Sequence, residues 1–454
     1  MRFTTHAKAA NPNESCFKVA GRCAARLCRR VGAIIFAIGL TVTGCTSSAL
    51  KPLMPTPLLY TELGRGPLDH IPEGERWKPR RVYFATTRER LPNLQRIDYG
   101  NKEAPLLSIG MALIGFGAED ISWSDLNRYS REAERDRVVD LSISGLVEAG
   151  KLDARPDSGA FELTGAAAWL VADLKASIGS ARDRDLLIYV HGAKVNFYNA
   201  CVFAAQLDHF MGRDMVSLAF AWPSRQNIVA YGTGGDVKRA YRSAEAFASL
   251  LEVLARESGA RRIHIVCWSA GGRLVSSALS ELRDRYSGLE SKELRQRLRI
   301  GTVYFAAADV PGDEFIDRLP AINEVATRVV VTASEKDGAL KKAKLLMGGG
   351  TRIGSVKGDL TPDQQKTVLA ADRLEVIDVS RGWLGRGFDI TGHSYWFDHP
   401  WASSDLILAV RSDFGPADRA LEPTDHAMLW TIPEDYPSRL RSILTRPGLQ
   451  LRGE

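Results

Sequence analysis

A serine stands between a strand-like and a helix-like segment, and the residues around it are small. Residues 267–272 read Cys-Trp-Ser-Ala-Gly-Gly, directly after the apolar run 263–266. A sharp turn from strand to helix points a serine hydroxyl outward and requires small neighbours. Gly271 fills the second glycine position of the usual Gly-x-Ser-x-Gly pattern, and Cys267 replaces the first. We therefore predict that Ser269 is a nucleophile for acyl chemistry.

A nucleophilic serine needs a base that takes its proton and an acid that orients the base. In folds that place a serine on such a turn, the acid and then the histidine follow later in the chain. Asp337 follows the strand-like segment 328–333, and His393 follows the next one. We predict a catalytic triad of Ser269, His393 and Asp337. Asp309 also follows a strand-like segment and stays open as an alternative acid.

The same chemistry requires hydrogen-bond donors for a developing oxyanion. The apolar run 186–190 ends in His191, Gly192 and Ala193. A turn at this point would present the backbone N–H of Ala193, and the N–H of Ala270 would be the second donor. We expect His191 to shape this loop and not to act as the base.

Strand-like and helix-like segments alternate from residue 80 onward and would position these groups. Repeated alternation predicts an α/β fold with a mostly parallel central sheet and helices on both faces. The expected strands are residues 82–85, 186–190, 215–222, 263–266, 303–305, 329–331 and 374–377. The expected helices are residues 166–176, 198–210, 237–254, 274–282, 340–346 and 405–410.

The first 44 residues have the pattern of an export signal. Arg29 and Arg30 precede the apolar run 31–42, which is too short for a bilayer core that needs about 20 residues. The run leads into Gly-Cys, which resembles the bacterial lipobox. We predict that residues 1–44 are a lipoprotein signal peptide and that Cys45 is lipidated.

The segment after Cys45 is rich in proline, which fixes φ and removes backbone donors. We predict that residues 45–79 form an extended tether and that residues 80–454 form the body, with an N-terminal extension at about 101–180. Thr46 after the cysteine favours the outer membrane, facing the periplasm, if the organism has one. The expected location is therefore the cell envelope. The prolines are Pro52, Pro55, Pro57, Pro67 and Pro72.

The net charge of +6 comes from the N-terminal segment. Residues 1–44 hold seven of the 60 basic and one of the 54 acidic residues, so the rest of the chain is formally neutral. This distribution argues against a nucleic-acid partner. The spacing of the His, Cys and Asp residues predicts no metal or cofactor site. Cys201 and Cys267 follow the leader, and we expect both to be free thiols.

Together these motifs resemble an uncharacterised α/β-hydrolase family, domain of unknown function nine hundred, over roughly residues 80–410. The resemblance implies an α/β-hydrolase fold and a serine hydrolase whose triad matches Ser269, Asp337 and His393. Trp268 and Ala193 depart from the family pattern beside the expected pocket. The matching strings are Val-Tyr-Phe-Ala-Thr-Thr-Arg at 82–88, Tyr-Val-His-Gly at 189–192, Phe-Ala-Trp-Pro-Ser at 220–224, Ser-Ala-Gly at 269–271, Asp-Gly-Ala-Leu at 337–340 and Gly-His-Ser-Tyr at 392–395.

The sequence therefore predicts a serine hydrolase that acts on an ester or another acyl substrate, either a small molecule or lipid-like. A lipid on Cys45 would anchor it to the membrane. Two alternatives stay open. One is a non-catalytic envelope lipoprotein that uses the fold as a binding scaffold. The other is an acyltransferase that passes the acyl group to an acceptor other than water.

Overall fold

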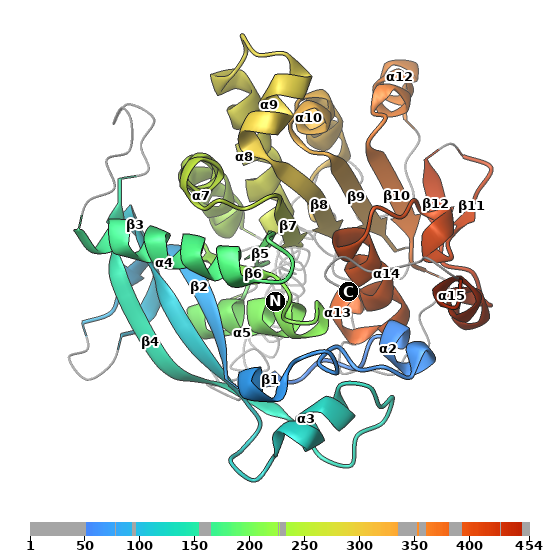
Figure 1. Cartoon of the computed structure of the whole chain (residues 1–454). Coiled ribbons are helices and arrows are strands. Elements are labelled where there is room, and N and C mark those ends of the chain that lie inside the picture. Colours follow the sequence, from blue (N-terminus) through green and yellow to red (C-terminus); the bar gives the residue numbers. More distant parts are fainter. Residues whose placement is uncertain are drawn as a thin grey trace, which may run out of the picture. The chain divides into compact units, whose positions relative to one another are not determined.

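The fold is built around one β-sheet. The computed structural model describes residues 51–77, 79–92, 97–153, 165–225, 227, 233–334, 352–353, 360–380, 393–426 and 428–446. Within these residues the sheet has 12 strands in the order β1-β4-β3-β2-β6-β5-β7-β8-β9-β10-β12-β11 (Figure 1). The strands are β1 (Lys51–Pro52), β2 (Arg80–Arg90), β3 (Tyr99–Phe116), β4 (Asp140–Leu152), β5 (Leu186–Val190), β6 (Val216–Ala221), β7 (Ile263–Trp268), β8 (Ile300–Ala306), β9 (Arg328–Ala333), β10 (Leu374–Asp378), β11 (Glu422–Pro423) and β12 (Leu429–Thr431).

In the order of the sheet, the strands β2-β6-β5-β7-β8-β9-β10-β12 pair in parallel, and antiparallel strands extend the sheet at its two edges. At one edge β3, β4 and β1 are antiparallel, and at the other β11 is antiparallel to β12. The predicted mostly parallel α/β sheet is confirmed. Each of the seven expected strands overlaps a strand of the structure, and β5 has the expected bounds.

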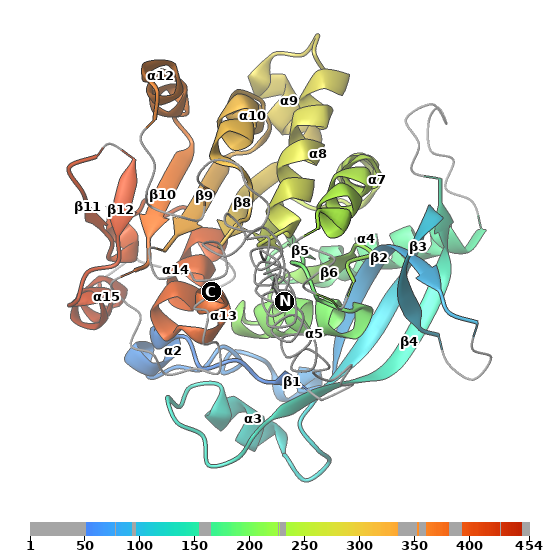
Figure 2. The same cartoon turned by 180° about the vertical axis from the view of Figure 1, so that it is seen from behind.

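Helices cover both faces of the central strands. Figures 1 and 2 show α7, α8, α9 and α10 on one side and α5, α13 and α14 on the other. The helices are α2 (Leu58–Leu63), α3 (Trp123–Tyr129), α4 (Gly165–Ser180), α5 (Phe197–Phe210), α7 (Gly235–Glu257), α8 (Gly271–Arg285), α9 (Ser291–Leu298), α10 (Gly312–Val325), α12 (Pro362–Ala370), α13 (Tyr395–Asp398), α14 (Pro400–Arg411) and α15 (Tyr436–Leu444). None of these helices is both long and apolar enough to cross a bilayer.

The core consists of two buried clusters, one on each face of the sheet. Successive strand residues point to opposite faces, so Leu187 and Tyr189 enter one cluster, whereas Leu186, Ile188 and Val190 enter the other. Because both faces are covered, the central strands are continuous apolar runs. This is why they could be identified from the sequence.

The segment Lys51–Trp77 packs on the body, so the prediction of an extended tether is wrong for these residues. Leu53 and Leu59 are at most 4% exposed and belong to a core cluster. The Leu53 N–H donates to Val139 O at 2.7 Å. Proline content describes the local backbone, but the apolar side chains between the prolines are buried, and α2 packs against α14 and α15. The compact body accordingly includes these residues and does not begin at residue 80.

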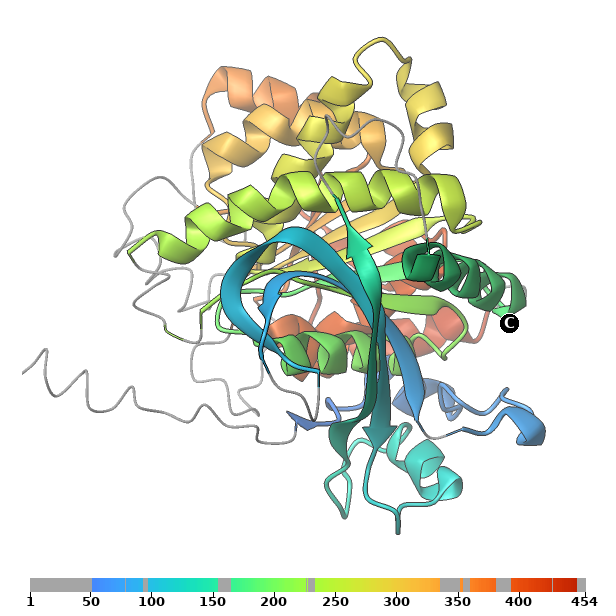
Figure 3. The same cartoon turned by 90° about the vertical axis from the view of Figure 1, so that its left-hand side faces the viewer.

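The expected extension at about residues 101–180 is a pair of long antiparallel strands followed by a helix. β3 and β4 pair along most of their length and continue the sheet beyond β2, and Figure 3 shows them curving together. The following helix, α4, covers residues 166–176 as expected. The leader, Cys45 and the expected helix 340–346 lie outside the described residues.

Candidate active site

Ser269 stands at the junction of β7 and α8 in a backbone conformation that disfavours side chains. Its φ is +52°, a left-handed value that costs a non-glycine residue about 1–2 kcal/mol. Hydrogen bonds on both sides hold the residue there. Its N–H donates to Ala306 O at 3.0 Å, and its carbonyl accepts from Gly272 N at 3.0 Å and Asp309 N at 3.1 Å. The turn therefore fixes the serine at the carboxyl end of β7.

Two glycines let the chain of β5 approach this turn closely. A Cβ on Gly271 would lie 2.7 Å from the carbonyl oxygens of Val190 and His191. A Cβ on Gly192 would lie 3.0 Å from Ser269 Cβ. The loop that follows β5 is thus packed directly against the serine.

We expect Gly271→Ala to lower the free energy of unfolding by about 1–3 kcal/mol, because the atoms in its way belong to the backbone and cannot rotate aside. Urea unfolding monitored by circular dichroism would measure the change. Gly179→Ala is the matched control, because the added Cβ meets nothing within 4 Å, and helical alanine is expected to be neutral or stabilising. An unchanged unfolding midpoint for Gly271→Ala would contradict the close approach.

His393 lies beside the serine. Its Nε2 is 2.8 Å from Ser269 Oγ, within hydrogen-bonding distance. Trp268 Nε1 donates to the His393 carbonyl at 3.2 Å, and the two rings lie 5.6 Å apart. The Tyr395 hydroxyl donates to Thr332 O at 3.1 Å and ties the next residues to the end of β9. The strand-to-helix turn at Ser269, here called the elbow, and the ends of the neighbouring strands therefore position the imidazole.

The two candidate acids are placed differently. Asp337 lies outside the described residues. Asp309 is buried, and its carboxylate forms ion pairs with Arg352 at 2.7 Å and with Arg273 at 3.5 Å. Both guanidinium groups are themselves buried, so Asp309 neutralises two charges inside the protein.

The two predicted oxyanion donors belong to the two segments that meet at the serine. Ala270 follows it directly and precedes α8, where the first N–H groups of a helix have no partner within the helix. Ala193 follows Gly192, the residue that approaches Ser269.

His191 is completely buried in the same loop. Burial, with a smaller effect of the Arg88 charge, lowers the pKa of His191 to about 3. The imidazole is therefore neutral at physiological pH and has a structural place in the loop, as expected from the sequence.

A low pKa for a buried histidine predicts loss of stability in acid. The unfolded imidazole takes up a proton below about pH 6.5, whereas the folded one stays neutral until about pH 3. Unfolding therefore binds a proton between these values, and His191 should lower the free energy of unfolding by up to about 1.4 kcal/mol for each pH unit of acidification. We expect His191→Asn to have a shallower slope by that amount in urea unfolding between about pH 5 and 6.5. Equal slopes would contradict the burial; His426→Asn, at an exposed side chain, is the control.

Trp268, which the sequence placed beside the expected pocket, belongs to an aromatic cluster next to His393 whose other members the sequence did not assign to the site. The Trp268 ring lies 6.1 Å from Phe203 and 5.9 Å from Trp396, and Phe203 lies 4.8 Å from Phe397. Cys201 and Cys267 are buried free thiols, as expected. Among the described residues, no group of three or more His, Cys, Asp or Glu side chains could hold a metal ion.

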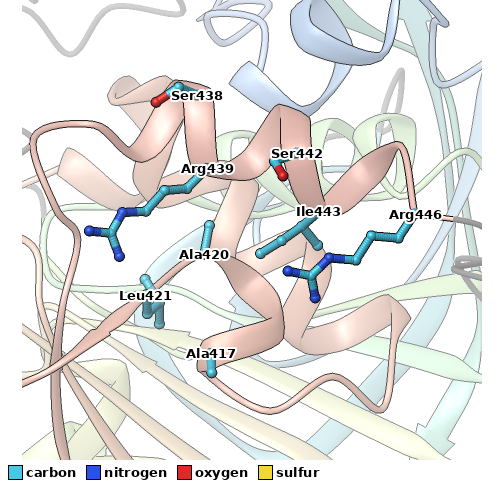
Figure 4. Close-up of a pocket in the computed structure, with 8 residues that line it drawn as sticks. All are labelled: Ala417, Ala420, Leu421, Ser438, Arg439, Ser442, Ile443 and Arg446. Atoms are coloured by element: carbon cyan, nitrogen blue, oxygen red, sulfur yellow. The ribbon is translucent and has the colours of Figure 1, made fainter.

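A pocket of about 350 Å³ lies elsewhere, between α15 and the segment after α14. Figure 4 shows Arg439 and Arg446 beside it. None of the predicted site residues lines this pocket, and Arg439 already pairs with Glu422 and Asp435. The pocket is therefore separate from the Ser269 site. Its lining residues are Ala417, Ala420, Leu421, Ser438, Arg439, Ser442, Ile443 and Arg446.

Comparison with known proteins gives one family and several distant structures. The family described as "Alpha/beta hydrolase of unknown function (DUF900)" matches residues 166–410. No curated protein matches the chain. Dienelactone hydrolase from Anabaena variabilis is similar at 13% identity, over 46% of this chain and 79% of that one, with a TM-score of 0.26. Esterase B from Lactobacillus rhamnosis is similar at 11% identity, over 41% of this chain and 73% of that one, with a TM-score of 0.21.

Proposed function

The chain belongs to the alpha/beta hydrolase family of unknown function, and on that premise we propose that it is a serine hydrolase that cleaves esters or other acyl compounds. The observation that carries the proposal is the 2.8 Å distance between Ser269 Oγ and His393 Nε2 at a strained strand-to-helix turn. Strain of this kind persists only where the surrounding structure holds it, and it concentrates at functional sites.

The proposed reaction has two steps. His393 takes the proton of the Ser269 hydroxyl as the oxygen attacks the acyl carbon, and the same proton then passes to the leaving alcohol. The N–H groups of Ala193 and Ala270 stabilise the oxyanion in each tetrahedral intermediate. Water, deprotonated by His393, then attacks the acyl-enzyme, releases the acid and restores the serine.

Asp337 is the proposed acid that holds the other ring nitrogen of His393. Its support is the position in the sequence, soon after β9, where this fold supplies a triad acid. Asp309 is the weaker candidate because its carboxylate already neutralises the buried guanidinium groups of Arg273 and Arg352.

The proposed substrates are small-molecule or lipid-like acyl compounds. The aromatic side chains of Trp268 and Phe203 are partly exposed; the Trp268 ring lies 5.6 Å from the His393 ring, and Phe203 packs against Trp268. Such surfaces favour apolar acyl or alcohol groups over charged ones. A polar substrate would leave this side of the site without complementary contacts.

A fluorophosphonate probe tests the proposal directly, because it reacts with activated serines. We expect covalent labelling of the full chain, located by peptide mass spectrometry at Ser269, together with hydrolysis of p-nitrophenyl butyrate. A folded chain that shows neither would overturn the proposal in favour of a non-catalytic binding scaffold. Acyl transfer would appear as acylated acceptor when glycerol or a lyso-phospholipid competes with water.

Anchoring to the cell envelope through a lipid on Cys45 is also proposed, supported by the lipobox-like sequence. We expect the full chain, expressed in a bacterium, to sediment with membranes and to dissolve in detergent. Cys45→Ser removes the acceptor thiol, and we expect it to move the protein to the soluble fraction. Cys201→Ser, which leaves the leader intact, is the control, and equal distribution of Cys45→Ser and wild type would contradict the anchor.

A further inference from the structure

Arg88 is a buried cation in the protein interior near the proposed site. It is 1% exposed and lies near the carboxyl end of β2, which is next to β6 and then β5 in the sheet (Figure 1). Among the described residues no carboxylate forms an ion pair with it. Its guanidinium instead donates to backbone carbonyls, at 2.6 Å to Val195 and at 2.8 Å to Gly100. A buried charge satisfied in this way fixes the positions of the carbonyls it binds.

Arg88 also reaches the imidazole of His191, with Nη2 at 3.4 Å from Nε2. A guanidinium can only donate hydrogen bonds, so Nε2 must accept. The other ring nitrogen, Nδ1, lies 2.7 Å from the carbonyl oxygen of Gly192, which can only accept. Both contacts fit the same neutral tautomer, with the proton on Nδ1.

The bond to Gly192 O sets the direction of the Ala193 N–H. Within a trans peptide the C=O and the following N–H point in opposite directions. Because the imidazole of His191 holds the Gly192 carbonyl, the Ala193 N–H points in the opposite direction within the same peptide plane, away from the imidazole. This N–H is one of the two proposed oxyanion donors.

Trp222 and Ser224 support the same loop. Trp222 Nε1 donates to His191 O at 2.7 Å, and its ring stacks on the imidazole at 5.2 Å with an interplanar angle of 11°. Ser224 Oγ donates to Val195 O at 2.8 Å. Three of the sequence strings that match the family therefore converge on this loop. They are residues 82–88, which end in Arg88, residues 189–192, which contain His191, and residues 220–224, which contain Trp222 and Ser224.

We propose that Arg88 and His191 are positioning residues that keep the Ala193 N–H directed as an oxyanion donor by fixing the Nδ1–H tautomer of His191. The inference rests on the proposed function. Neither side chain needs to touch the substrate, because both are buried and act through the backbone of the loop.

Substitution at His191 separates positioning from packing. The side-chain amide of His191→Asn can replace Nδ1–H as a donor to Gly192 O, whereas His191→Leu fills the space without a donor. Loss of one oxyanion donor costs about 10²–10³-fold in kcat. We therefore expect kcat of the leucine variant to fall by about 10²-fold with KM changed less than about threefold, and the asparagine variant to stay at least about tenfold above it. Equal losses in the two folded variants would overturn the inference.

A readout independent of activity keeps the inference testable if a variant fails to fold. In the wild-type chain labelled with ¹⁵N-histidine, we expect the His191 ring to show a protonated Nδ1 and an unprotonated Nε2, and Arg88→Met to broaden or shift these signals. An active wild-type enzyme with a protonated Nε2 would overturn this inference and leave the proposed function standing. An inactive chain with a protonated Nδ1 would overturn the proposed function, leaving the contact between Arg88 and His191 as loop architecture.

Discussion

Replacing Ser269 with alanine is expected to lower kcat for p-nitrophenyl butyrate by at least about 10⁴-fold and to abolish fluorophosphonate labelling. The alanine side chain has no oxygen to attack the acyl carbon, whereas the proposed donors at Ala193 and Ala270 and the imidazole of His393 stay in place. Residual turnover would come from these groups acting on water. Initial rates and the mass of the labelled protein measure the two effects.

A second serine–histidine pair provides a matched control. Ser130 Oγ lies 2.7 Å from His209 Nε2, a distance like that at the proposed site. Ser130 is completely buried and its hydroxyl donates to Leu126 O, so it cannot reach a substrate. We expect Ser130→Ala to keep both turnover and labelling. Activity lost in the Ser130 variant and retained in Ser269→Ala would place the nucleophile elsewhere.

The strain at the elbow predicts a difference between two inactive variants. Ser269→Ala keeps a Cβ at a φ of +52°, whereas Ser269→Gly removes it. Glycine adopts this conformation without steric cost but loses more entropy on folding, by roughly 0.5–1 kcal/mol. Relief of about 1–2 kcal/mol of strain exceeds that loss, so the glycine variant should be at least as stable as the alanine variant. Such a result would show that the turn is held at the expense of stability.

The central sheet could be predicted because each buried strand is an uninterrupted apolar segment. β5 consists of Leu-Leu-Ile-Tyr-Val, and all five residues are buried. The long strands β3 and β4 were not recognised. Burial alternates over residues 110–116 of β3, but apolar residues or glycine occupy both the buried and the half-buried positions, and β4 shows no regular alternation. The close packing of β3 and β4 explains the glycine at position 110, because a Cβ there would lie 2.0 Å from Val147 O. A glycine required by close strand packing looks like a loop residue in the sequence.

The proximity of Ser269 and His393 could be predicted: Ser269 from the consecutive residues of its turn, and His393 from its place in the chain order. The contacts of Arg88 could not be predicted in this way. Its partners Val195 and Ser224 are 107 and 136 residues away along the chain, and no spacing rule connects them. The same limit applied to Lys51–Trp77, whose burial depends on contacts with helices far away along the chain, α5, α14 and α15. Asp337 and Cys45 lie outside the described residues and stay predictions.

Substitution of His393 tests the base with an effect nearly as large as that of the serine. We expect His393→Ala to lower kcat by about 10⁴-fold, because the Ser269 hydroxyl loses the group that accepts its proton. The segment should stay in place, since Trp268 Nε1 binds the backbone carbonyl of residue 393 and Tyr395 binds Thr332 O. Added imidazole should therefore restore part of the rate by occupying the vacated space. Steady-state kinetics with and without imidazole measure both effects.

His399→Asn is the matched control for the loss of an imidazole from the same region. His399 Nδ1 accepts from Trp401 N at 3.1 Å at the start of α14, and an asparagine oxygen can replace that acceptor, so kcat should be retained. A folded His393→Ala variant with wild-type kcat would require another base within reach of Ser269. His191 cannot take that role, because its Nδ1 donates to Gly192 O and its Nε2 accepts from Arg88. The proposed hydrolase mechanism would then fail at its first proton transfer, and the 2.8 Å contact would be a structural hydrogen bond of the elbow.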